Sequence, residues 1–132
     1  IIECAGKEGH ASELRRVVAE AQEATQAEGG LCAVVMPRQR DARRLARQLE
    51  EAGLAAPAVV DGEGALPERG VVITSLKLAK GLEFDWVIVA DASARIFGDD
   101  DLARRRLYTT LSRATRRLTV LSCGPLSPWL KG

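Results

Sequence analysis

VVITSLKLAKGLEFDWVIVAD, residues 71–91, contains two apolar runs on either side of a short polar segment. Val71–Ile73 and Trp86–Val89 are continuous β-branched and aromatic runs. Such runs predict strands that are buried on both faces of a parallel sheet. Lys80 and Glu83 lie between them, and an unpaired buried charge is costly, so we expect both at the rim where the strands end. In open α/β sheets, that rim is where ligands bind.

The rest of the chain alternates between strand-like and helix-like segments. Strand-like runs are expected at about residues 1–5, 31–36, 55–60 and 118–123. Apolar residues recur at helical spacing over residues 10–28 and 41–52, and again after Asp101. Residues 61–69, DGEGALPER, have the composition of a loop. This alternation predicts a three-layer α/β domain with a mainly parallel sheet flanked by helices and right-handed crossovers.

Two segments, SLKLAKGLEF at residues 75–84 and LYTTLSRA at residues 107–114, resemble motifs of the UvrD/Rep-type superfamily 1 helicases. Residues 75–84, SLKLAKGLEF, are similar to motif V, usually T-x-H-x-x-K-G-L-E-F. Residues 107–114, LYTTLSRA, are similar to motif VI, usually L-Y-V-A-L-T-R-A. The resemblance implies a RecA-like, P-loop NTPase-like fold. Residues 1–132 would then be a single C-terminal helicase domain of the compact form without the large inserted domain, with motif IV at about 34–53, motif V at 74–85 and motif VI at 107–117.

By this resemblance, one set of residues contacts ATP. Arg113 would be the arginine finger that acts on the γ-phosphate, and Glu83 would bind the ribose. Lys80 and Gly81 would form a turn that brings the backbone close to the phosphates, which Gly permits because it has no side chain. The residues also allow plainer readings: a local salt bridge between Lys80 and Glu83, and a surface arginine at 113 that pairs with an acid.

The start of the second helix is strongly basic. At the position of motif IV, where the family usually has an arginine that reaches the terminal phosphate, Pro37 stands in this chain, so Arg38 or Arg40 would have to substitute. The positive end of the helix there also favours anions. The alternative is a solvated face in which these arginines pair with surface acids such as Glu50 and Glu51.

A second implied set contacts single-stranded DNA. Ser75 stands where the family has Thr, and Lys77 where it has His, at positions that usually touch the phosphodiester backbone. Lysine keeps a hydrogen-bond donor and adds a full charge. Aromatic residues make up only 4% of the chain, so we expect little base stacking.

Composition limits the class of protein. The formal net charge is +1, so any basic surface that binds nucleic acid must be local. With one His and three scattered cysteines, no metal site is expected, and Asp99–Asp101 read as a helix cap rather than as metal ligands. No apolar run has the length of a membrane span, so a cytoplasmic protein without membrane contact is expected. The chain begins at Ile1 without Met and is expected to be a piece of a longer protein.

The expected activity follows from what the chain has and lacks. It contains no G-x-x-x-x-G-K-[ST] phosphate loop, so alone it should be inactive. The resemblance implies an ATP-dependent DNA helicase or translocase in which ATP with Mg²⁺ binds between this domain and an N-terminal RecA-like domain. Three alternatives stay open: a HelD-like ATPase that remodels RNA polymerase, a non-catalytic binding module with a degenerate motor fold, and an unrelated doubly wound enzyme.

Overall fold

The computed structural model describes residues 1–55, 57–61 and 66–131. Its centre is one sheet of six strands in the order β1-β6-β5-β2-β4-β3, and every pair of neighbouring strands is parallel. The strands are β1 (Ile2–Cys4), β2 (Leu31–Met36), β3 (Ala58–Val59), β4 (Gly70–Ser75), β5 (Phe84–Val89) and β6 (Ala114–Cys123). The predicted α/β class with a parallel sheet is therefore confirmed.

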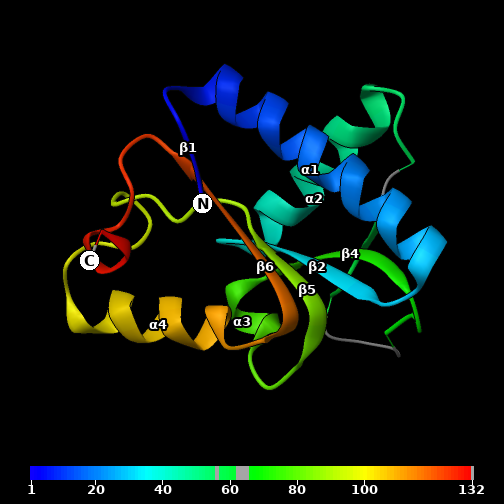
Figure 1. The fold of residues 1–132 in the computed structure, drawn as a ribbon. Helices are drawn as coiled ribbons and strands as arrows, with labels where there is room; N and C mark the ends of the chain where they lie inside the picture. The colour runs from blue at the N-terminus through cyan, green and yellow to red at the C-terminus, as the bar shows by residue number, and fades with distance from the viewer. Residues whose placement is uncertain (56, 62–65, 132) are drawn as a thin grey trace.

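Helices cover both faces of the sheet (Figure 1). One face carries α1 (Lys7–Glu28) and α2 (Gln39–Glu51), and the other carries α3 (Leu76–Ala79) and α4 (Asp101–Leu111). A short 3₁₀ helix, η1 (Pro128–Leu130), follows the last strand. The layers are thus helix, sheet and helix, as predicted.

The central strand β2 shows why these residues form this sheet. Its side chains alternate between two apolar clusters: Cys32 and Val34 pack with the α1 and α2 side, and Ala33 and Val35 pack with the α3 and α4 side. All four are fully buried or nearly so. A strand flanked by strands and covered on both faces must be apolar at successive positions, which explains the unbroken run in the sequence.

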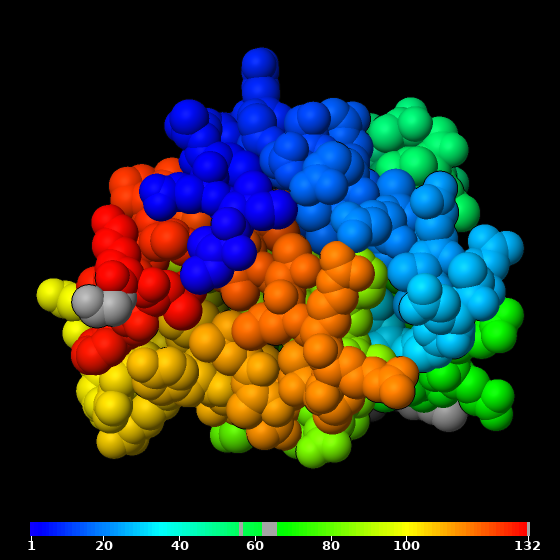
Figure 2. Space-filling model, in the orientation of Figure 1, coloured from blue at the N-terminus to red at the C-terminus, as the bar shows by residue number. Residues whose placement is uncertain are grey.

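The last strand is longer than predicted. β6 begins at Ala114 rather than at residue 118, and its first half is exposed, with the polar residues Thr115 and Arg116. β1 pairs only with Leu121–Cys123, so the earlier part of β6 is an open edge of the sheet. Figure 2 shows this part, in orange, at the surface between α1 and α4. Polar residues at an open edge do not produce the apolar pattern by which a buried strand is recognised.

Other boundaries differ by a few residues. α1 begins three residues earlier than predicted, and α2 begins two residues earlier, at Gln39. α3 was not predicted, because four residues are too few to show a helical period. β3 is shorter than the predicted 55–60, of which residue 56 lies outside the described residues, as do residues 62–65 of the predicted loop.

The strands of the sheet start at one end and finish at the other, and we call these ends the amino edge and the carboxyl edge. Strands begin at the amino edge with Leu31, Gly70, Phe84 and Ala114, and they end at the carboxyl edge. The C-terminal tail packs at the carboxyl end, where Leu126 bridges to Ser93 and Trp129 Nε1 donates to the carbonyl oxygen of Gly98 (2.8 Å). The tail therefore leaves the amino edge uncovered.

Candidate functional site

The segment between α3 and β5 forms a tight turn at the amino edge. Lys80 has φ −61° and ψ 126°, Gly81 has φ 86°, and the amide of Leu82 donates to the carbonyl oxygen of Ala79 (3.0 Å). These values describe a type II turn, whose third residue needs a positive φ. A Cβ on Gly81 would meet no atom within 4 Å. Glycine is therefore required by the backbone conformation and not by crowding, and the turn leaves Lys80 and Glu83 exposed.

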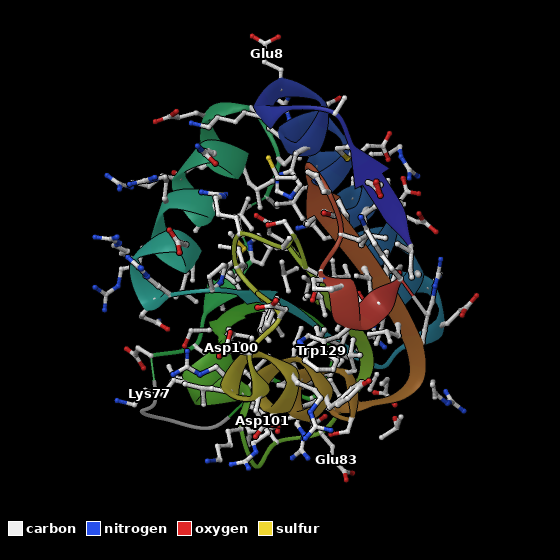
Figure 3. The ribbon with its side chains drawn as sticks, turned by 90° about the vertical axis from the view of Figure 1, so that its left-hand side faces the viewer. Glu8, Lys77, Glu83, Asp100, Asp101 and Trp129 are labelled. Atoms are coloured by element: carbon white, nitrogen blue, oxygen red, sulfur yellow. The ribbon has the colours of Figure 1, made fainter. Side chains whose placement is uncertain are left out.

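Glu83 and Arg113 are brought together by the pairing of β5 with β6. The amide of Phe84 donates to the carbonyl oxygen of Arg113 (2.8 Å), and Thr115 Oγ1 donates to the carbonyl oxygen of Phe84 (3.2 Å). Glu83 precedes Phe84 directly, so it and Arg113 lie at the same point of the amino edge. Figure 3 shows the side chain of Glu83 directed away from the body of the molecule.

Arg113 lies just past the end of α4 rather than within it. Its Nε donates to the carbonyl oxygen of Thr109 (3.1 Å), and its Nη2 donates to Ser112 Oγ (3.2 Å). The guanidinium thus folds back over the negative end of the helix, where a cation is favoured. A guanidinium has five N–H donors, and these two bonds leave the others for a ligand.

The charged residues at the amino edge, Lys80, Glu83 and Arg113, have no ionic partner among the residues that the structure describes. The plainer readings, a Lys80–Glu83 salt bridge and an Arg113–acid pair, are therefore absent from this structure. Two hollows of about 230 and 450 Å³ are lined by residues other than Lys80, Glu83 and Arg113.

The position of Lys80 and Glu83 at the amino edge corrects one prediction from the sequence. The sequence pattern predicts Lys80 and Glu83 at the rim where the strands end, but in the structure they lie at the opposite rim, where β5 begins. In a parallel sheet, each crossover must return the chain from the carboxyl end of one strand to the amino end of the next. Residues that directly precede a strand therefore lie at the amino edge.

Arg38, Ser75 and Lys77 lie at the carboxyl edge. Met36 is in register with Ser75, Arg38 follows as the N-cap of α2, and Lys77 is in the single turn of α3. Ser75 Oγ accepts from the amide of Leu78 (3.3 Å), so this buried residue also caps α3. Arg38 and Lys77 are exposed. The structure thus separates Arg38 from the other predicted nucleotide residues and groups it with the predicted DNA residues.

Ser112 and Thr115 were not identified from the sequence. Ser112 Oγ accepts a hydrogen bond from the Arg113 guanidinium, and Thr115 Oγ1 donates to the carbonyl oxygen of Phe84. Both lie close to Arg113 within the motif, so their position next to a candidate finger is the available signal.

Among the three acids Asp99–Asp101, Asp100 caps α4 by accepting a hydrogen bond from the amide of Ala103 (3.2 Å), which confirms the predicted helix cap.

No group of three or more His, Cys, Asp or Glu side chains that could hold a metal ion occurs within the part of the chain that the structure describes. The same part contains no helix with the length and apolar character needed to cross a bilayer.

Comparisons with known proteins agree with the fold. Residues 70–121 match the model of a family described as the UvrD-like helicase C-terminal domain. The structure is similar to that of the C-terminal domain of a possible DNA helicase from Lactobacillus plantarum WCFS1, with a TM-score of 0.78 and 29% identity, over 98% of this chain and 76% of that one. The C-terminal domain of the DEAD-box protein Dbp5 shares the fold, with a TM-score of 0.60 and 16% identity over 91% and 73%. A search of curated protein sequences gave no match.

Proposed function

Because residues 70–121 match the model of the UvrD-like helicase C-terminal domain family, we propose that this chain is the second motor domain of an ATP-dependent superfamily 1 DNA helicase or translocase. In this proposal, an N-terminal RecA-like domain holds ATP with Mg²⁺, and the amino edge of this chain completes the site. The observation that carries it is the junction of Phe84 with Arg113, which sets Glu83 and Arg113 at one point of an uncovered edge.

The residues of the amino edge fit a nucleotide. Glu83 is an exposed carboxylate without an ionic partner in the described chain, and a carboxylate can accept hydrogen bonds from both ribose hydroxyls. The type II turn at Lys80 and Gly81 presents backbone and one cation beside it. Bound ATP would supply the phosphoryl group, and Mg²⁺ would neutralise part of its charge.

Arg113 is proposed to stabilise the charge that develops on the γ-phosphate. Its planar, permanently charged fork suits phosphoryl oxygens, and such fingers contribute roughly 10³ to 10⁵ in rate. In this structure the guanidinium is held by Thr109 and Ser112, through one backbone and one hydroxyl contact. Neither contact involves an opposite charge, so Arg113 can exchange them for a phosphate without breaking an ion pair.

The carboxyl edge is proposed to contact single-stranded DNA. Lys77 and Arg38 provide exposed cations on neighbouring strand ends, and Ser75 positions α3 through its cap. Phosphate contacts of this kind give affinity that does not depend on sequence. We therefore reassign Arg38 from the nucleotide to the DNA, because it lies at the opposite edge from Arg113.

Arg113→Ala in the protein that joins this chain to its N-terminal motor domain tests the proposal. We expect ATP turnover with saturating single-stranded DNA to fall by roughly 10³-fold or more, while DNA affinity stays within a few-fold. Arg105→Ala is the matched control, because Arg105 is an exposed arginine on α4 that pairs with Asp101 and should leave turnover unchanged. Unchanged turnover in Arg113→Ala would overturn the finger and favour a degenerate binding module.

The choice of activator separates the DNA motor from the HelD-like alternative. The exposed cations at the carboxyl edge favour DNA as the activator. We expect single-stranded DNA to stimulate ATP turnover, and Lys77→Gln to weaken that stimulation by raising the DNA concentration needed. Stimulation by RNA polymerase and not by DNA would assign the protein to the remodelling class.

A further inference from the structure

The outer face of α2 carries a stripe of arginines that the motor function does not use. Arg40, Arg43, Arg44 and Arg47 are all exposed. At about 100° per residue, these four arginines lie on one face along the helix. The buried residues of α2 are Ala42, Leu45 and Leu49, on the opposite side. Figure 3 shows nitrogen-tipped side chains of α2 pointing away from the rest of the molecule.

These four arginines, the α2 stripe, form no ion pair within the part of the chain that the structure describes. Every ion pair found among the described residues lies elsewhere, although Glu51 stands only one turn beyond Arg47. The other helices have both kinds of arginine: Arg16 of α1 pairs with Glu13 and Glu20, and Arg104 and Arg105 of α4 pair with Asp101, whereas Arg15 and Arg106 form no ion pair among the described residues. Of the described helices, only α2 carries four exposed arginines without an ion pair. The chain's net charge is only +1, so this helix face is a concentrated positive surface.

The stripe continues from the carboxyl edge. α2 starts directly after β2, and Arg38 is its N-cap, next in the chain to the strand end that is in register with Ser75. Figure 3 shows Lys77 on the same side of the molecule as α2. A nucleic acid held at the carboxyl edge would therefore meet the first turn of α2 as it leaves that edge.

The composition of α2 indicates which part of the nucleic acid it suits. Its sequence, QRDARRLARQLEE, contains no aromatic residue, so it has no platform on which an unpaired base could stack. Guanidinium groups in a line on a rigid helix suit phosphates, which a duplex presents on its outside while its bases remain stacked. We propose that the α2 stripe binds the phosphate backbone of the DNA duplex adjoining the single strand. This inference rests on the proposed function of the carboxyl edge.

The experiment compares two DNA ligands and two triple variants of the protein. The ligands are an oligothymidine single strand and the same single strand joined as a tail to a hairpin duplex. The tail is attached at either the 3′ end or the 5′ end of the hairpin. The stripe variant is Arg43→Gln, Arg44→Gln and Arg47→Gln. The control removes the same charge at three exposed helical arginines, Arg15, Arg16 and Arg105, each changed to Gln. Fluorescence anisotropy gives affinity as a function of NaCl concentration, and thermal unfolding shows that each variant is folded.

We expect the wild type to bind the tailed duplex at least several-fold more tightly than the tail. The stripe variant should lose this advantage. For the tailed duplex, the slope of log affinity against log salt concentration should fall in magnitude by about 2 to 3, because each of the three lost phosphate contacts accounts for about 0.9. The control variant should keep both properties.

Other outcomes overturn the inference in distinguishable ways. An equal loss on tail and tailed duplex would mean that the stripe contacts the single strand, and no loss on either would make it a solvated face. Preferential binding of polyglutamate through the stripe would assign it to an acidic protein. Failure of the wild type to bind the tail, or an unchanged tail affinity in Lys77→Gln, would count against the carboxyl-edge function instead.

Discussion

The guanidinium carbon of Arg117 lies 3.8 Å from the centre of the Trp86 ring. The same guanidinium donates to Glu20 of α1 (2.8 Å), and Trp86 Nε1 donates to Thr119 Oγ1 (3.0 Å). These contacts join β5, β6 and α1 at the open half of β6, where no further strand supplies hydrogen bonds. The exposed half of the last strand pairs with β5 on one side, and on its open side Arg117 ties it to α1 and to the Trp86 ring.

Arg117→Ala should lower the free energy of unfolding by about 1 kcal/mol, mainly through loss of the contact with the buried Trp86 ring. The ion pair with Glu20 should add little, because both side chains are about half exposed. Urea titration measures the change as a lower midpoint at constant slope. Arg116→Ala, the exposed neighbour, should change the midpoint little, and an equal loss in both variants would contradict a specific role for the ring contact.

Gly81→Ala should destabilise the protein by about 1 to 2 kcal/mol, because Gly81 has a positive φ that an L side chain adopts at a cost. Space is available, since a Cβ there meets nothing within 4 Å. Gly9→Ala is the matched control: it is equally uncrowded but lies in α1, so it should be neutral or stabilising by up to about 1 kcal/mol. Thermal unfolding of the two variants tests this, and a shift of the same sign in both would refute the conformational argument.

Asp100→Ala should cost about 0.5 to 2 kcal/mol, because its carboxylate is the cap of α4. The effect should also reach Arg113, which follows the far end of the same helix. Asp99→Ala removes a similar exposed charge one residue earlier, outside the helix, and should cost much less. Chemical denaturation of both variants compares them directly, and equal losses would mean that the acids act through overall charge rather than as a cap.

The layers of this fold follow from the apolar runs, but the edge on which the site lies does not. The run in β2 predicts a strand covered on both faces, which the structure confirms. Consecutive strands β4 and β5 are nevertheless separated in the sheet by β2. Strand order depends on contacts between distant segments, so local patterns do not contain it. The predicted rim for Lys80 and Glu83 is wrong for a different reason: both residues directly precede β5, and such residues lie at the amino edge of a parallel sheet.

The two motifs predicted the residues of the candidate site but not all of their positions in the fold. Lys80, Glu83 and Arg113 were each found from local sequence, and their common edge follows once β5 and β6 pair in parallel. Arg38 was assigned by counting along the chain, and it lies at the other edge because it follows a strand rather than preceding one. The hydrogen bond of Thr115 to Phe84 depends on strand pairing, which the motif does not contain, whereas Ser112 contacts its neighbour Arg113 and is signalled only by that position.

The thiol of Cys32 provides a prediction about pH. Cys32 is fully buried, and its burial raises the pKa from 9.0 to about 12, with Arg117 acting weakly in the opposite direction. Between these two values the unfolded chain has lost the proton and the folded chain has kept it. Stability should therefore fall as pH rises above about 9, by up to about 1.4 kcal/mol per pH unit from this group.

Cys32→Ala should remove this contribution, so its free energy of unfolding should decline less steeply between pH 9 and 11 than that of the wild type. The comparison uses slopes, because loss of the thiol also leaves a small cavity that lowers stability at every pH. Cys123→Ala is the control, since that residue is only partly buried and its variant keeps Cys32. Urea unfolding at a series of pH values gives the slopes. Identical slopes in Cys32→Ala and wild type would show that the buried thiol ionises in the folded protein as readily as in the unfolded chain, which its complete enclosure argues against.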